Sequence, residues 1–115
     1  TFELSRPQGV QIQTDKSGKV SLLWELEEGV QGYYVYYSEK SGFYIRRKDV
    51  GKTNFVEFPG FEKGRTFYFA VTAYDDDGNE SDYSNEVSVT VGVPGSESNG
   101  FSGNPQEAKG GLKNP

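Results

Sequence analysis

The chain of 115 residues contains no Cys, no His and no Met. Without Cys there is no disulfide, no thiolate nucleophile and no thiolate metal site. Without His there is no serine–histidine pair, no usual zinc site and no imidazole base. Catalysis would have to rest on carboxylates, Tyr or Lys, so we predict that the chain is not an enzyme and has no cofactor. The absence of Cys leaves the cellular compartment undetermined.

Positive charge and long apolar runs are also scarce. Twelve basic residues against seventeen acidic residues give a formal net charge of −5 at pH 7. Binding to nucleic acid or to an anionic membrane without sequence specificity needs a basic surface, so neither partner is expected. No stretch of about 18 apolar residues occurs, so we expect no membrane insertion.

Turn-forming residues and aromatic residues are plentiful instead. The chain holds fifteen Gly and five Pro, and aromatic residues make up 15% of it. No segment places apolar residues at helical spacing over a helical length, so essentially no helix is expected. The length allows one domain and a tail.

The clearest pattern is the long alternating segment that begins at Phe67. Its first face consists of Phe67, Phe69, Val71 and Ala73, and its second face of Tyr68, Ala70, Thr72 and Tyr74. Side chains of a strand alternate between the two faces of a sheet. The first set therefore predicts a core face, and the second a solvated or contact surface.

Further strand signals recur at the spacing of a β-sandwich. Seven segments carry them: residues 7–12, 20–25, 33–37, 43–46, 56–58, 67–74 and 87–91. Asp49–Lys52 is expected to be a turn, and Trp24 a central core residue. These signals predict an all-β fold, an antiparallel sandwich of about seven strands in two sheets.

The composition changes near residue 93. Residues 94–115 hold only two bulky apolar side chains, Phe101 and Leu112, among Gly, Ser, Asn and Pro. Such a segment cannot bury enough surface to offset its ordering entropy. We therefore expect a domain over residues 1–92 and an irregular tail or linker over residues 93–115.

The domain resembles a fibronectin type III domain over roughly residues 5–92. The resemblance rests on Pro7, Trp24, Tyr33, Val35, Tyr37, Phe61, Gly64, Phe67 and the closing run 85–90. The sequence of residues 73–81 looks most like that of bacterial members of this family. The resemblance implies an immunoglobulin-like sandwich in a secreted or cell-surface protein, next to other domains of the same polypeptide.

One residue departs from the family pattern. Phe67 stands where the family has the tyrosine of its tyrosine corner, and it has no hydroxyl group to bond to the loop backbone. A shift of one residue would place Tyr68 there but would exchange the two faces of the whole strand. We expect the hydrogen bond to be missing, at a net cost of about 0.5–1.5 kcal/mol.

The acidic loop that follows Tyr74 invites comparison with calcium sites. Asp75, Asp77 and Glu80 could supply oxygen ligands. When Gly78 takes the glycine position of an EF-hand loop, Ala73 and Ser84 fall where that motif requires carboxylates. We therefore interpret the loop as a solvated turn and predict no metal site.

The second face of the alternating segment is the main binding candidate. Tyr34 and Tyr36 should lie next to Tyr68, Thr72 and Tyr74 across the sheet. Tyr is enriched at interfaces, but it also suits strands for structural reasons alone. A protein or a glycan is the expected partner if this face binds.

Three functions stay open at this point. The chain can be a non-catalytic structural or spacer module, a binding module that uses the tyrosine face, or a subunit of an extracellular assembly. In the third case Phe101 and Leu112 would dock the tail on a neighbour. We favour the spacer.

Overall fold

The computed structural model describes residues 4–98 and contains seven strands and no helix over that range. The strands are β1 (Gln11–Thr14), β2 (Val20–Leu23), β3 (Gly32–Ser38), β4 (Arg46–Gly51), β5 (Phe55–Phe58), β6 (Thr66–Tyr74) and β7 (Val87–Thr90). No helix of the described residues is long and apolar enough to cross a membrane.

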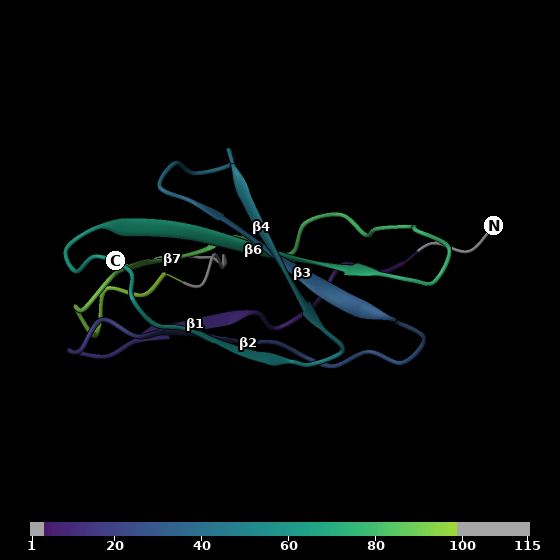
Figure 1. The fold of residues 1–115 in the computed structure, drawn as a ribbon, viewed down its shortest axis with the longest axis horizontal. Coiled ribbons are helices and arrows are strands. Elements are labelled where there is room, and N and C mark those ends of the chain that lie inside the picture. Colours follow the sequence, from purple (N-terminus) through teal and green to yellow (C-terminus); the bar gives the residue numbers. More distant parts are fainter. Residues whose placement is uncertain (1–3, 99–115) are drawn as a thin grey trace, which may run out of the picture.

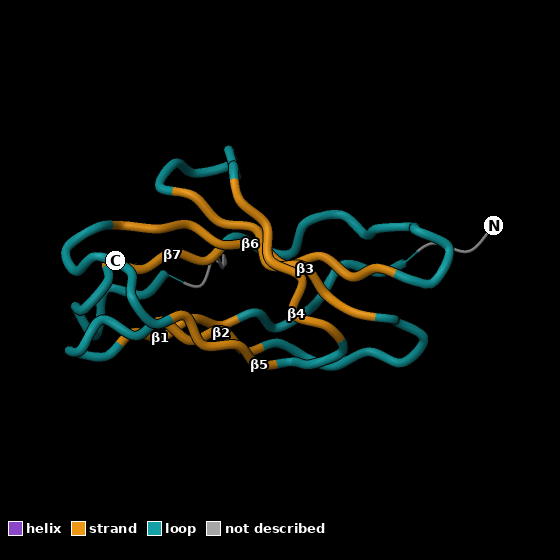
Figure 2. The backbone as a smooth tube through the Cα atoms, in the orientation of Figure 1, coloured by secondary structure: helices purple, strands orange, loops and turns teal. Residues whose placement is uncertain are grey.

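The strands form two antiparallel sheets that pack face to face (Figures 1 and 2). One sheet has three strands in the order β1-β2-β5, and the other has four in the order β4-β3-β6-β7. This arrangement confirms the predicted all-β sandwich of about seven strands in two sheets.

The core lies between the sheets and contains most of the residues expected there, while Phe67 is only partly buried at its edge. Trp24, Tyr33, Val35, Phe69 and Val71 are all buried. Trp24 and Tyr33 pack edge to face with their ring centroids 5.5 Å apart, and the Tyr33 hydroxyl accepts a hydrogen bond from the Glu27 amide at 2.8 Å. A second group of rings fills one end of the core: Tyr37, Phe58, Phe61, Phe67 and Phe69.

The region around β4 differs from the prediction. The sequence suggested a strand over residues 43–46 and a turn over 49–52, but β4 spans Arg46–Gly51. This strand pairs only with β3 and forms the edge of its sheet. Because an edge strand can be charged along its whole length, β4 lacks the apolar alternation that identifies other strands.

Residues 93–98 turn back along β7 instead of leaving the domain directly. Ser88 and Ser98 form an antiparallel bridge with two backbone hydrogen bonds of 2.8 Å. The Glu97 carboxylate accepts from the amides of Thr14 at 3.2 Å and Gly95 at 2.8 Å, so it links this segment to β1. Burial would raise the pKa of Glu97, but backbone hydrogen bonds, from its own amide first and then from Thr14 and Gly95, outweigh it and lower the pKa below its ordinary value.

Truncation of Phe69 tests the assigned core. Phe69→Ala should lower the free energy of unfolding by about 3–5 kcal/mol, because the ring is fully buried among other aromatic side chains. Phe55→Ala is the control and should cost less than about 1 kcal/mol, since Phe55 is half exposed on the outer face of the other sheet. Urea unfolding measures both changes. Equal losses would contradict the assigned register.

Candidate functional site on the four-stranded sheet

The structure brings most of the predicted tyrosine face together. In the β3–β6 pairing Tyr34 lies opposite Thr72, and Tyr36 lies opposite Ala70. The rings of Tyr34 and Tyr74 are 4.6 Å apart between centroids, and those of Tyr34 and Tyr36 are 6.4 Å apart. These neighbours follow from the alternation of two adjacent strands.

Tyr68 lies apart from this group. It pairs with Ser38 of β3 and Ser88 of β7, toward the opposite end of β6 from Tyr74. Of the five residues expected on the face, the structure therefore gathers Tyr34, Tyr36, Thr72 and Tyr74.

The second face of β6 is not uniformly solvated, contrary to the prediction. Ala70 is fully buried and Thr72 is 1% exposed. The connection between β6 and β7 covers them, because it runs alongside the end of β6. Ser81 and Ser84 hold it there through backbone hydrogen bonds of 2.8 Å to Ala73 and 2.9 Å to Val71. The sequence suggested a free surface at these positions because a loop leaves no periodic signal.

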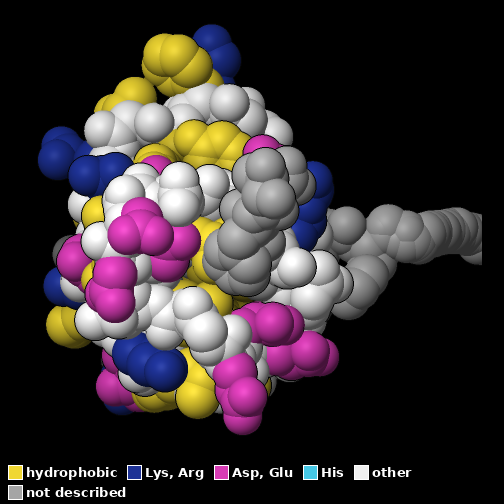
Figure 3. Space-filling model, turned by 90° about the vertical axis from the view of Figure 1, so that its right-hand side faces the viewer, with side chains coloured by type: hydrophobic (Ala, Val, Ile, Leu, Met, Phe, Trp, Pro, Cys, Tyr) yellow, Lys and Arg dark blue, Asp and Glu magenta, His cyan; other side chains and the backbone are white. Residues whose placement is uncertain are grey.

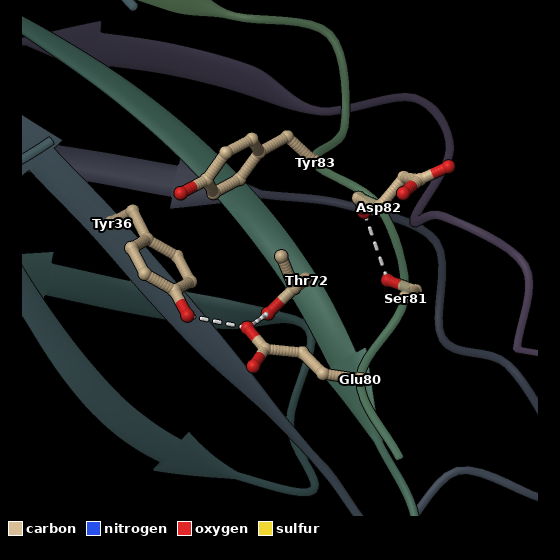
Figure 4. Close-up of a pocket in the computed structure, with 6 residues that line it drawn as sticks. All are labelled: Tyr36, Thr72, Glu80, Ser81, Asp82 and Tyr83. Atoms are coloured by element: carbon tan, nitrogen blue, oxygen red, sulfur yellow. Dashed lines mark hydrogen bonds between the residues drawn. The ribbon is translucent and has the colours of Figure 1, made fainter. Parts of the chain in front are cut away.

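Carboxylates of the surrounding segments accept hydrogen bonds from this face. Tyr36 donates its hydroxyl to Glu80, and Thr72 donates to the same oxygen at 2.8 Å (Figure 4). Tyr74 donates to Asp49 of β4 at 2.8 Å. The hydroxyl groups of Tyr36, Thr72 and Tyr74 thus each have a partner within the domain.

Arg47 completes the face from β4. Its guanidinium carbon lies 4.1 Å from the ring centroid of Tyr34 and 6.0 Å from that of Tyr36. The guanidinium also donates to the Tyr36 hydroxyl at 3.5 Å. Sequence reasoning missed Arg47, because it ended the strand at residue 46. Correct placement of β4 beside β3 would have shown that Arg47 lies on the tyrosine face.

Two further tyrosines extend the cluster beyond the strands. Tyr83 packs edge to face on Tyr36 at 5.0 Å and on Tyr44 at 5.1 Å between centroids. Tyr44 donates its hydroxyl to Glu86 at 2.5 Å. Sequence reasoning missed Tyr83 and Glu86 and grouped Glu80 with the acidic loop. All three lie in a connection whose path over the sheet has no sequence pattern.

An open hollow of about 300 Å³ lies at the centre of these residues. Figure 4 shows the rings of Tyr36 and Tyr83 beside it, with the Glu80 carboxylate turned toward the hydroxyl groups of Tyr36 and Thr72. Its remaining lining comes from Ser81 and Asp82. Tyr83 is 46% exposed and is the most accessible ring of the hollow.

The electrostatics keep the phenols protonated. Burial and the Glu86 carboxylate raise the pKa of Tyr44 far above its ordinary value. Burial and Glu80 raise the pKa of Tyr36, and the hydrogen bond to Asp49, with some burial, raises that of Tyr74. These groups act as hydrogen-bond donors at neutral pH. They have no character of a general base or a nucleophile.

The acidic loop is organised around Asp75. Its carboxylate accepts from the amides of Asp77 at 3.0 Å and Asn79 at 2.9 Å, and from the Asn79 side chain at 3.0 Å. These bonds, the Asn79 side chain foremost, lower the pKa of Asp75. Gly78 has a φ of 85°, as the tight turn requires. The loop has the hydrogen bonds of a turn led by Asp.

The weak calcium candidates do not converge in the structure. Glu80 turns to Tyr36 and Thr72 and does not join Asp75 and Asp77. Within residues 4–98 no group of three or more acidic side chains is placed to hold a metal ion. Phe101 and Leu112, the candidates for tail docking, lie outside the described residues.

Comparison with known proteins identifies the family. Residues 5–90 match the family model of the fibronectin type III domain, so the chain belongs to this family of β-sandwich modules. The chain is 33% identical to an amylopullulanase of Thermoanaerobacterium thermosulfurigenes over 80% of its length. It is 36% identical to one of Thermoanaerobacter thermohydrosulfuricus over 68%. It spans 5% of the length of each of these relatives.

Solved structures give the same fold. An Fn3-like protein from Clostridium thermocellum superposes with a TM-score of 0.62 at 26% identity, covering 74% of this chain and 90% of that one. A structure described as a myokine superposes with a TM-score of 0.63 at 20% identity, covering 77% of this chain and 98% of that one. At that identity the second likeness concerns the fold alone.

Alkaline titration tests the half-buried phenol of Tyr44. Its pKa is raised on folding, so the stabilisation from the protonated phenol is complete below the unfolded value of about 10 and is lost as pH rises above it. Tyr44→Phe should lose stability less steeply than the natural chain between about pH 9 and about pH 11. Unfolding by urea at several pH values measures the slopes.

Glu86→Gln is the companion variant for this test. It removes the charge that helps to raise the Tyr44 pKa, so the phenolate absorbance of the folded domain should appear at lower pH than in the natural chain. Identical slopes for Tyr44→Phe and the natural chain would contradict the assigned environment.

Proposed function

We propose that the chain is a non-catalytic structural module that holds its neighbours at a fixed separation in a larger secreted or cell-surface protein. The observation that supports this most is the internal bonding of the tyrosine face. Tyr36, Tyr44 and Tyr74 donate to Glu80, Glu86 and Asp49, and Arg47 stacks on Tyr34.

Internal bonding favours a structural role for a physical reason. A partner that engaged these hydroxyl groups would have to replace hydrogen bonds that the domain already makes, so the net gain on binding would be small. The same contacts tie β3, β4, β6 and the β6–β7 connection to one another. The face therefore gains rigidity at the expense of binding capacity.

The course of the chain also suits a spacer. The first described residues lie at one end of the molecule, and β7 runs toward the opposite end (Figure 1). Residues 93–98 then turn back beside β7. A module of this kind spans the distance between the two domains that flank it. The amylopullulanase relatives support a parent protein in which a catalytic domain is one of those neighbours.

Replacement of the module in the full-length protein tests this function. A flexible Gly/Ser linker in place of residues 5–92 should broaden the distribution of distances between the flanking domains, because such linkers behave as random coils. Small-angle scattering or distances between paired labels would measure the change. An unrelated rigid domain of similar length is the control and should keep the distribution narrow.

If the flexible linker leaves the separation of the flanking domains unchanged, the module does not set it. The flanking domains produced separately are the control for misfolding. If the linker-replaced protein lacks an activity that the separate domains retain, the replacement has disturbed their folding.

A binding module is the second candidate, and the hollow beside Tyr83 is the observation that favours it. Unlike the other rings, Tyr83 is half exposed, and Asp82 next to it lines the same hollow. A protein or a glycan would use Tyr83 as its aromatic anchor.

Substitution of this ring separates the two candidates. Tyr83→Ser should abolish association with a protein or glycan partner of the full-length protein, because aromatic anchors dominate small interfaces. Tyr68→Ser, on the same sheet but outside the hollow, is the matched control. Pull-down and glycan-array binding measure both variants, and undiminished binding by Tyr83→Ser would rule out the hollow as the binding site.

A further inference from the structure

The most exposed large apolar side chains of the described domain lie together on one loop. Phe43 is 63% exposed and Ile45 is 68% exposed, both in the β3–β4 loop (residues 39–45). Single exposed apolar residues are ordinary on a monomer. Two such residues, separated by one position on an ordered loop, form a compact projection, which we name the Phe43/Ile45 knob.

The loop is held rigidly by one carboxylate. Glu86 accepts hydrogen bonds from the Ser41 hydroxyl at 2.6 Å, the Gly42 amide at 2.9 Å and the Tyr44 hydroxyl at 2.5 Å. Tyr44 thereby points inward onto Tyr83. Its inward position leaves the residues on either side exposed. The knob is therefore fixed in place before any partner arrives, which lowers the entropy cost of binding.

The segment that carries the knob is basic, although the Glu86 carboxylate bonds to the loop and Glu39 stands at its start. Residues 40–48 contain four cations, Lys40, Arg46, Arg47 and Lys48, and no acidic residue, in a chain of net charge −5. The Lys40 ammonium lies 5.8 Å from the ring centroid of Phe43. At the top of Figure 3, over this loop, apolar side chains project next to Lys and Arg, whereas Asp and Glu side chains gather lower on the same view.

The loop lies at the end of the domain that β7 reaches. Arg65 of the β5–β6 connection pairs with Glu39 at the start of the loop at 2.7 Å. The same connection bonds to the end of β7 through Gly64 and the Val91 carbonyl at 2.9 Å. In Figure 2 the loop projects beyond both sheets. After β7 the chain turns back until Ser98 bridges Ser88, and Ser88 pairs with Tyr68, the partner of Ser38 at the base of the loop. The last described residue and the base of the loop therefore lie on the same sheet.

We propose that the Phe43/Ile45 knob docks on the adjacent domain of the same polypeptide, in an apolar hollow edged by carboxylates. This inference rests on the proposed structural function and adds to it a fixed angle between two domains. The knob alone is smaller than a stable interface between free proteins. Tethering removes that obstacle, because two surfaces of one polypeptide meet at an effective concentration that can reach about millimolar.

The experiment uses the full-length protein with Phe43→Ser and Ile45→Ser combined. Hydrogen exchange at the docked surface of the adjacent domain should accelerate at least about tenfold, because the variant removes the apolar contact that protects it. The maximum dimension from small-angle scattering should rise as well. Leu23→Ser with Phe55→Ser is the matched control, a cross-strand pair that is 44% and 47% exposed on the other sheet. It should change neither measurement.

A separate variant tests the contribution of the basic residues. Arg46→Glu with Lys48→Glu should accelerate the same exchange, and high salt should reduce the difference from the natural protein. Unchanged exchange and dimension in the knob variant would overturn the proposal. If flexible-linker replacement still broadened the domain separation, the spacer would stand without the docked angle. If the replacement had no effect, the spacer itself would fail.

Two alternative occupants are outcomes of the same variant in the isolated chain. The 115-residue chain alone should sediment as a monomer and should not bind vesicles containing phosphatidylserine. Dimerisation that the Ser variant abolishes would identify a second copy as the occupant and overturn the proposal. Vesicle binding that the variant abolishes would identify an anionic lipid surface and overturn it too.

Discussion

The antiparallel pairing of β3 with β6 is the constraint on which the rest of the molecule depends. It is the central pair of the four-stranded sheet, and it places Val35 opposite Val71 and Tyr34 opposite Thr72. The first pair enters the core and the second lies on the outer face. Because strand side chains alternate with a period of two, a slip of one residue would exchange the two faces and bury tyrosine hydroxyl groups without partners.

This register ties the candidate site to the stability of the fold. Glu80 accepts from one residue of β3 and one of β6, and Asp49 of β4 accepts from Tyr74 of β6. The outer face therefore fastens three strands together as well as presenting a surface. A change at Tyr36 would therefore alter the stability of the sheet and the exposed surface at the same time. Tyr83 belongs to the β6–β7 connection and is half exposed. A change there would affect the surface more than the pairing of the strands.

The sequence predicted the parts of the site that obey strand periodicity. Alternation placed Tyr34, Tyr36, Thr72 and Tyr74 on one face, and the resemblance to fibronectin type III domains predicted the sandwich that the family match confirms. Alternation carries no information about loops, so Tyr83 and Glu86 were missed and Glu80 was grouped with the acidic loop. The burial of Thr72 was missed with them, because it depends on where the β6–β7 connection runs. Arg47 was missed because a charged edge strand lacks an apolar period.

Phe67 shows how the fold accommodates the loss of a family contact. The absent hydroxyl group forgoes a hydrogen bond of about 0.5–1.5 kcal/mol. The Phe67 ring stacks on Phe61 with centroids 4.5 Å apart and planes inclined by 23°, and an aromatic pair contributes about 0.5–1.5 kcal/mol beyond burial. Apolar packing therefore holds the corner without the hydrogen bond. Phe61 belongs to the connection that also carries Arg65, and Arg65 pairs with Glu39 at the start of the β3–β4 loop. The stacked corner thus supports the base of the Phe43/Ile45 knob from one side, while Glu86 fixes its tip from the other.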